Sequence, residues 1–317
     1  MKRKIIWGVT ILLVCFLGGE LLLRNIWGFG KMPLYYASNK YEYMPCPNQS
    51  GIRFGNHYRY NSYSQRSDEP DSTKLHVLGL GDSVLYGGTQ TDQDSLATSL
   101  FTKDTGIQML NISAGSWGPD NCAAYLKEYG LFNAKALFLL VSSHDAYDNM
   151  DFQPIVGHHP SYPDKQYASA WQEILCRYIY PQFIKPYLHS SSNDPDPDQK
   201  VLQGIHKSGK EFNSGFEELR KIAQAAKIPF IICLHADKFE LQSKCYNEQG
   251  QEIIQWAADH NIPLVKDMDH GITDKDYRDD IHINAHGQKK LTEIMKETLL
   301  NEGNIKPSYY AKDNQPD

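Results

Sequence analysis

One serine and one histidine, far apart in the chain, have surroundings that suit acyl chemistry. Ser83 stands in the glycine-rich run Leu78–Gly88, which overlaps the end of the apolar run Leu75–Leu80. This pattern predicts a buried strand that ends in a tight turn with a hydroxyl at its tip. His282 stands just before the last helical pattern, and Asp279 precedes it by three residues. A carboxylate at that spacing can fold back onto the imidazole, fix its tautomer and stabilise its charged form.

Each of these motifs is weak by itself. A Gly-Asp-Ser turn is ordinary loop chemistry, and an Asp-x-x-His turn with Asn284 as an N-cap is an ordinary way to begin a helix. Together they predict a nucleophile, a base and an acid. Ser83 would be the nucleophile, His282 the general base and then acid, and Asp279 the group that orients the imidazole.

The elements that must bring these residues together alternate from residue 75 onward. Strands are expected at Leu75–Leu80, Ile107–Ile112, Ala136–Val141, Pro229–Leu234 and Pro263–Lys266. Helical patterns lie at Ser95–Thr102, Asn121–Leu131, Glu211–Ala226, Gln251–His260 and Ala285–Leu300. Strands that alternate with helices predict a parallel sheet covered on both faces. The expected fold is therefore α/β, a three-layer α/β/α sandwich with a five-stranded parallel sheet.

The rest of the chain falls into segments of different composition. We expect a membrane anchor at residues 1–30 and a tyrosine-rich lead-in at 31–74 that packs on the domain. The α/β domain is expected at 75–303 and a polar tail at 304–317. A short hairpin is expected around residues 57–63. An insertion at about 146–209 interrupts the domain, with a helical pattern at Trp171–Tyr180 and an exposed Ser/Asp/Pro run at 190–198. An insertion after a strand end is where a substrate-shaping lid would lie.

The first residues have the pattern of a membrane anchor. A basic start, Met1–Lys4, precedes the 19 mostly apolar residues Ile5–Leu23, about the length that crosses a bilayer as a helix. The charges predict that the N-terminus stays inside and the domain lies on the extracytoplasmic side. A cleaved signal peptide is the competing interpretation. Because no small-x-small cleavage site follows, and Val14 before Cys15 does not suit a lipoprotein signal, an uncleaved anchor is favoured.

The composition of the chain bears on which partners, disulfide bonds and metal ions it could have. The chain has 32 Lys and Arg against 38 Asp and Glu, a net charge of −6, with no long basic run beyond the start. This disfavours a nucleic-acid partner. The six cysteines have no Cys-x-x-Cys spacing, and the sequence leaves open whether Cys233 bridges Cys245 or Cys46 bridges another. Asp267, Asp269 and His270 follow a strand end, where carboxylates commonly cap turns. We predict no metal and no cofactor.

The two motifs together resemble those of the SGNH, or GDSL-like, hydrolase superfamily, in particular its membrane-anchored members. The resemblance covers roughly residues 75–300. Gly81-Asp82-Ser83 matches the family's serine block, and Asp279 to His282, with Asn284 and Gly287 after it, matches the closing block. The resemblance implies a serine hydrolase that acts on esters through an acyl-enzyme.

The resemblance also implies an oxyanion hole. The family's second block matches the segment Asn111–Gly118, with the Gly118 N–H as donor and Gly115 as the alternative. Its third block, Gly-x-Asn-Asp, is Ser-Ser-His-Asp here, so His144 stands in place of the asparagine. An imidazole can also donate a hydrogen bond. The expected hole is Ser83, Gly118 and His144, and Asn149 is the alternative to His144.

The expected substrate is an acylated small molecule or glycan, in particular an O-acylated carbohydrate. This follows from the resemblance and from the outward placement of the domain. One alternative is an O-acetyltransferase that passes the acyl group to a glycan. Another is a non-catalytic glycan-binding or assembly protein, which the altered third block makes conceivable.

Overall fold

A parallel sheet forms the centre of the protein, which is described here from a computed structural model of residues 2–185, 205, 207 and 209–301. Within these residues its strands are β5 (His76–Gly81), β6 (Gln108–Ser113), β7 (Leu137–Ser142), β8 (Phe230–His235) and β9 (Leu264–Lys266). Their spatial order is β6-β5-β7-β8-β9, and all neighbours run parallel. The predicted α/β fold with five parallel strands is confirmed, and each strand begins within one residue of its expected start.

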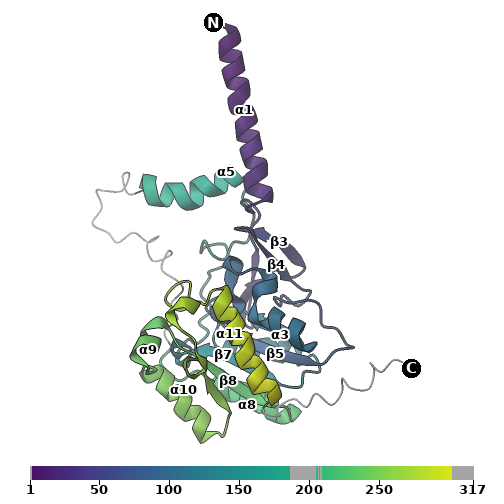
Figure 1. Ribbon diagram of the computed structural model, residues 1–317, viewed down its shortest axis with the longest axis vertical. Helices are drawn as coiled ribbons and strands as arrows, with labels where there is room; N and C mark the ends of the chain where they lie inside the picture. Colours follow the sequence, from purple (N-terminus) through teal and green to yellow (C-terminus); the bar gives the residue numbers. More distant parts are fainter. Residues whose placement is uncertain (1, 186–204, 206, 208, 302–317) are drawn as a thin grey trace.

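Helices cover both faces of the sheet, because alternate residues of a strand point to opposite sides. The main helices are α3 (Ala97–Thr105), α4 (Pro119–Tyr129), α8 (Gly215–Ala226), α9 (Lys238–Ser243), α10 (Glu248–Asp259) and α11 (Ala285–Lys296). In β7, Leu137 and Leu139 belong to the core layer with α4, α8 and α10, whereas Phe138 and Leu140 belong to the layer with α3 and α11. Figure 1 shows α3 and α11 together on one side of the sheet.

Short helical turns follow several strands and are not evident from hydrophobic periodicity. They are α2 (Ser83–Tyr86), η1 (Gly88–Gln90), η2 (Gln93–Ser95), η3 (Ser143–Ala146), η5 (Asp267–His270) and η6 (Asp274–Asp276). The π-helix η7 (Glu297–Asn301) instead continues α11, within the predicted last helix. Two of them, α2 and η3, begin directly at the carboxyl ends of the adjacent strands β5 and β7. Residues after both strands therefore meet at one edge of the sheet.

The lead-in forms two hairpins that pack against the domain. The first pairs β1 (Tyr35–Ser38) with β2 (Glu42–Pro45), and the second pairs β3 (Gln49–Arg53) with β4 (Asn56–Tyr60). The Tyr43 carbonyl accepts a hydrogen bond of 3.0 Å from the Trp117 indole. The expected hairpin near residues 57–63 is present, but it lies earlier in the chain. Its turn is at Phe54 and Gly55, both with positive φ.

The N-terminal helix and the insertion helix lie outside the sandwich. Helix α1 (Lys2–Asn25) is, within the described part of the chain, the helix long and apolar enough to cross a membrane. Helix α5 (Ala170–Glu173) continues directly into η4 (Ile174–Ile184), a π-helix, so the helix predicted within the insertion is present and longer than expected. Figure 1 shows it extending sideways from the domain end of α1. The Ser/Asp/Pro run and the polar tail lie outside the described residues.

Candidate active site

Ser83 lies at the carboxyl end of β5, as the first residue of α2. Asp82 is the N-cap of this turn, and its Oδ1 accepts a hydrogen bond of 2.8 Å from the Val84 N–H. Gly87 ends the turn with φ of 69°, and its N–H donates to the Ser83 carbonyl. A glycine is favoured there because other residues rarely adopt positive φ. The turn leaves the Ser83 side chain half-buried, at the wall of a cavity of about 530 Å³.

The structure brings His282 and Asp279 to Ser83. The His282 Nε2 lies 3.0 Å from the Ser83 Oγ, and its Nδ1 lies 2.9 Å from the Asp279 Oδ2. An ionised carboxylate can only accept, so Nδ1 carries the proton and Nε2 is left to accept from the serine hydroxyl. Burial opposes ionisation of Asp279, but hydrogen bonds from backbone N–H groups and the charge of His282 lower its pKa. The three side chains form the hydrogen-bonded chain that nucleophilic catalysis requires.

Arg278 connects the loop that carries His282 to the segment that follows Ser83. Its guanidinium donates to the Gly87 carbonyl at 3.0 Å and to the Thr91 hydroxyl at 3.2 Å, both in the segment that follows Ser83. It also lies 3.6 Å from the Asp279 carboxylate. The loop that carries the base is thus attached to the loop that carries the nucleophile. Sequence reasoning did not identify Arg278, because its role depends on a contact between segments almost two hundred residues apart.

The glycine segment after β6 contributes Gly115 and Ser116 to the cavity wall. Gly118 lies elsewhere: it is buried at the start of α4, and its N–H donates to the Asn121 Oδ1 at 2.9 Å. The expected donor Gly118 is therefore not brought to Ser83, whereas its alternative Gly115 is. Asn149 is also directed away from the cavity, since its amide donates to the Tyr147 and Glu211 carbonyls.

Ser116 is a further candidate donor that the sequence did not indicate. Its φ of 56° is unusual for a residue with a side chain. The Gly115 carbonyl accepts hydrogen bonds from the Tyr43 and Tyr162 hydroxyls at 2.8 and 2.9 Å. In a trans peptide the C=O and the following N–H point in opposite directions, so the Ser116 N–H faces away from both hydroxyls. Neither the positive φ nor this peptide orientation can be read from residue types.

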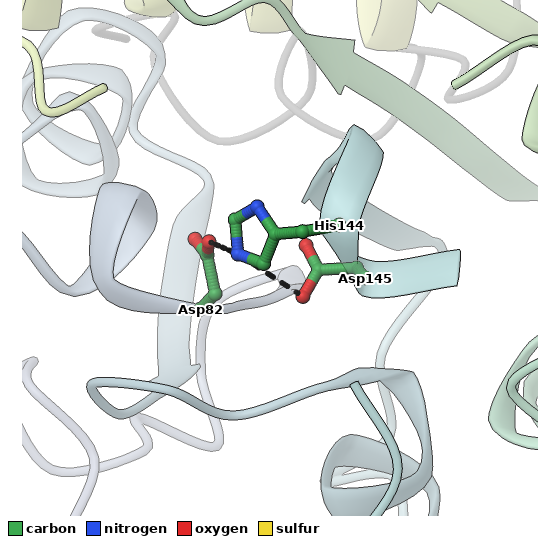
Figure 2. Close-up of side chains that lie close together, drawn as sticks. All are labelled: Asp82, His144 and Asp145. Atoms are coloured by element: carbon green, nitrogen blue, oxygen red, sulfur yellow. Dashed lines mark ion pairs between the residues drawn. The ribbon is translucent and has the colours of Figure 1, made fainter. Parts of the chain in front are cut away.

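His144 faces a group of acids beside Ser83. Its Nε2 lies 3.9 Å from the Asp82 Oδ2 and the Asp145 Oδ1, and 3.8 Å from the Asp148 Oδ2. Figure 2 shows the imidazole between the carboxylates of Asp82 and Asp145. These separations exceed hydrogen-bond length. His144, Ser83 and Ser116 line one hollow, so His144 lies beside the nucleophile.

The two innermost carboxylates of this group are strongly desolvated. The Asp82 Oδ2 and the Asp145 Oδ1 are buried and have no hydrogen-bond partner. Burial, together with the charges of Asp82 and Asp148, raises the pKa of Asp145 well above its usual range. Two buried carboxylates at such close range disfavour each other's ionisation.

The side chains that could together bind a metal ion are not Asp267, Asp269 and His270, which the sequence brings to notice. Within the described residues, ligand atoms of Asp82, His144 and Asp145 lie within 4.8 Å of one another. Asp267, Asp269 and His270 are not brought together in this way. Asp267 pairs with a buried histidine, and the His270 ring faces Glu297 at 3.2 Å. The six cysteines are all free.

A second histidine–aspartate pair lies behind the first. His235, at the end of β8, contacts the Asp267 carboxylate through Nδ1, and its Nε2 lies 2.7 Å from the Ile281 carbonyl. Burial opposes a charge on this ring, but the carboxylate and both hydrogen bonds raise the pKa of His235 to about 9. The ring is then a double donor, and it holds the peptide next to His282 in place.

Comparison with known proteins found similarity in solved structures only. No protein-family model and no curated protein matches the chain. The lipase/acylhydrolase from Enterococcus faecalis is similar with 12% identity, 74% of this chain and 98% of that chain covered, and a TM-score of 0.41. The esterase EstA from Pseudoalteromonas sp. has 15% identity, coverages of 73% and 100%, and a TM-score of 0.39. A carbohydrate acetylesterase family member from Sinorhizobium meliloti has 10% identity, coverages of 71% and 97%, and a TM-score of 0.40.

The architecture and the motifs agree with the resemblance noted in the sequence. The sheet has five parallel strands in the order β6-β5-β7-β8-β9. The Gly-Asp-Ser turn follows β5, and the Asp-x-x-His turn precedes the last helix, α11. The five-stranded parallel α/β fold is thus the one that this resemblance predicts.

Proposed function

We propose that the protein is a serine esterase whose nucleophile is Ser83. The observation that carries this proposal is the continuous hydrogen-bonded chain from Ser83 through His282 to Asp279. A serine hydroxyl is a weak nucleophile by itself, and an adjacent base activates it. His282 can take the hydroxyl proton because its Nε2 faces Ser83, and Asp279 stabilises the charge that then develops on the ring.

The reaction would proceed in two halves. The Ser83 Oγ attacks the ester carbonyl while its proton passes to His282, and the resulting tetrahedral intermediate carries the negative charge on oxygen. His282 then gives the proton to the leaving alcohol, and the acyl group remains on Ser83. Water repeats the sequence with His282 as base, which releases the acid and the free serine.

The oxyanion donors we propose are the backbone N–H groups of Ser83 and Ser116, with His144 as the side-chain donor. Gly115 is the neighbouring alternative to Ser116. Ser116 and His144 share one hollow with Ser83. A donor that faces the developing charge can lower the barrier by several kcal/mol, about 3 or 4 for one such group.

The substrate we propose is an O-acylated carbohydrate on the extracytoplasmic side of the membrane. Lys2, Arg3 and Lys4, the first residues of α1, favour an inside position for the N-terminus. Tyrosines, which can pack against sugar rings, line the cavity: Tyr35, Tyr86, Tyr162 and Tyr178. Acyl transfer to a glycan hydroxyl is the second candidate, because the same acyl-enzyme could react with a sugar instead of water.

Hydrolysis of p-nitrophenyl acetate by the purified full chain tests the proposal. Wild-type protein should release nitrophenolate, and Ser83→Ala should lower kcat/KM by roughly 10⁴-fold or more. Ser113→Ala, a hydroxyl loss at the end of β6, is the matched control. Equal rates in wild type and Ser83→Ala would refute a serine esterase. A glycan with free hydroxyls can be added as an acceptor. Acetylation of this glycan at a higher rate than the release of free acetate would identify a transferase.

A further inference from the structure

The helix from Ala170 to Ile184 exposes most of its apolar side chains, while its charged residues are buried (Glu173) or half-buried (Arg177). Phe183 is 65% exposed and Leu175 is 49% exposed. The exposed residues are mostly apolar, with two glutamines among them: Gln172, Leu175, Cys176, Ile179, Tyr180, Gln182, Phe183 and Ile184. A surface helix of a soluble protein has the opposite arrangement, with its charges in water and its apolar stripe in the core. The outward side of this helix therefore suits an apolar environment.

The charged residues of the same helix are satisfied on its inner side. Glu173 is fully buried and pairs with the equally buried Arg53 of β3. Arg177 donates to the Pro160 carbonyl, and the Tyr178 hydroxyl accepts from Arg53 at 3.1 Å. Both charged residues of the helix make contacts on its inner side, and its exposed residues from 174 to 184 carry no charge. This arrangement is expected of an element that faces lipid.

The helix begins against the membrane-length helix α1. The Trp171 ring stacks on Phe16, with 5.6 Å between ring centroids, and its indole N–H donates to the Phe16 carbonyl. The Ala170 N–H donates to Glu20 at 2.9 Å. Helix α1 has 24 residues and is thus roughly 36 Å long, somewhat more than the roughly 30 Å hydrocarbon core. Phe16 and Glu20 lie in its second half, on the side of the domain.

We propose that Ala170–Ile184 lies in the lipid–water interface of the membrane that α1 enters, with its outward side among the lipid chains. The partner is a phospholipid bilayer surface. Figure 1 shows this helix crossing the direction of α1 rather than continuing it, as an interfacial helix does beside a spanning one. Its tryptophan and tyrosines suit the same position, because aromatic residues with one polar edge favour the interface.

The same helix is also a wall of the candidate active site. Arg177 and Tyr178, on its inner side, line the cavity that holds Ser83 and His282. An interfacial position would therefore place this end of the cavity beside the bilayer surface. If the proposed esterase function holds, an ester carried by a molecule anchored in that surface is the substrate class within reach of Ser83.

The depth of Cys176 in a bilayer tests the position of the helix without any use of activity. Cys15, Cys46 and Cys245 are replaced by Ser, and the full chain is placed in vesicles of phosphatidylcholine and phosphatidylglycerol. A nitroxide then labels Cys176, since the remaining Cys122 and Cys233 are buried. We expect collisions with oxygen to exceed collisions with a water-soluble nickel chelate at this site. A label on Cys245, with Cys176 replaced instead, should show the reverse.

Two results would overturn the proposal. Nickel access at Cys176 equal to that at Cys245 would place the helix in water. Low access to both reagents would mean that a second copy or another protein covers it. Ile179→Glu with Phe183→Glu should shift the Cys176 label towards nickel access, while hydrolysis of soluble p-nitrophenyl acetate continues. Absence of that hydrolysis in the unmutated chain would reject the esterase function but leave the depth result valid.

Discussion

Asp279 is the most exposed of the three residues Ser83, His282 and Asp279, and its contribution can be measured separately. Asp279→Asn keeps the size of the side chain but presents an amide to the His282 Nδ1, which disfavours the tautomer that can accept from Ser83. We expect kcat/KM for p-nitrophenyl acetate to fall by roughly 10³–10⁴-fold. Asp280→Asn alters the adjacent exposed carboxylate and should leave the rate unchanged. Equal losses in both variants would indicate a general effect of charge.

His144 provides a second test at the scale of one residue. If it donates to the oxyanion, His144→Ala should lower the acylation rate by about a hundredfold or more. His144→Asn restores a side-chain N–H donor and should recover part of that loss. Pre-steady-state acylation with an aryl acetate measures both. Near-normal acylation in His144→Ala would remove this residue from the oxyanion hole.

Some residues of the candidate site could be predicted from the sequence, and others depend on contacts that only the structure shows. Ser83, Asp279 and His282 could be selected from the sequence, because each lies in a short motif with a chemical reason for its spacing. Gly118 is expected from the family resemblance alone, and its N–H donates to Asn121 in the structure. Ser116 could not be selected, because its position depends on a positive φ and on two tyrosine hydroxyls from distant segments.

At the scale of an element, the end of β8 should make stability depend on pH. Folding raises the pKa of His235 from 6.5 to about 9, so the folded protein holds a proton that the unfolded chain releases. The stabilisation is complete below about pH 6.5 and is lost as the pH rises to 9. The free energy of unfolding should fall by roughly 3 kcal/mol over that range. Urea unfolding at several pH values measures it.

A double variant serves as the control for this pH effect. His235→Gln with Asp267→Asn keeps polar groups at both positions but removes the titrating pair. Its unfolding free energy should change less between pH 6.5 and pH 9 than that of the wild type. An unchanged slope would mean that another group binds the proton.

The strand that carries Ser83 depends on a close backbone approach at Gly81. A Cβ there would lie 2.8 Å from the Leu140 carbonyl oxygen of the neighbouring strand. Gly81→Ala should therefore destabilise the protein by about 1–3 kcal/mol, the usual cost of overpacking. Gly79→Ala, in the same strand, meets its nearest atoms at 3.4 Å and should cost less. Urea unfolding of both variants distinguishes local crowding from a general loss of glycine.

The strands of the sheet were predictable because each is a short apolar run buried on both faces. The insertion helix was predictable in part: its pattern indicates a helix at Trp171–Tyr180, but not its continuation to Ile184. The exposure of its apolar side becomes visible only when the structure buries Glu173 and directs Arg177 to the Pro160 carbonyl. The short turns α2 and η3 are set by strand ends and capping groups, which hydrophobic periodicity does not report.

For the whole molecule, a buried ion pair joins the lead-in to the insertion. Arg53 and Glu173 have side chains only 2% and 0% exposed, and Glu173 also accepts from the Gly30 N–H. Glu173→Gln leaves the Arg53 charge without its counterion and should cost about 3–5 kcal/mol. Glu293→Gln, which breaks an exposed pair with Lys296, should cost at most about 1 kcal/mol. Similar losses, measured by urea unfolding in detergent, would contradict the role of the buried pair.

In the proposed esterase the whole fold makes Ser83 a reactive nucleophile, and covalent labelling tests this most directly. The full chain is treated with diisopropyl fluorophosphate, and the modified residue is located by peptide mass spectrometry. We predict a single modification at Ser83, which is strongly reduced in His282→Ala and absent in Ser83→Ala. No modification of the wild type, or equal modification in His282→Ala, would contradict the account.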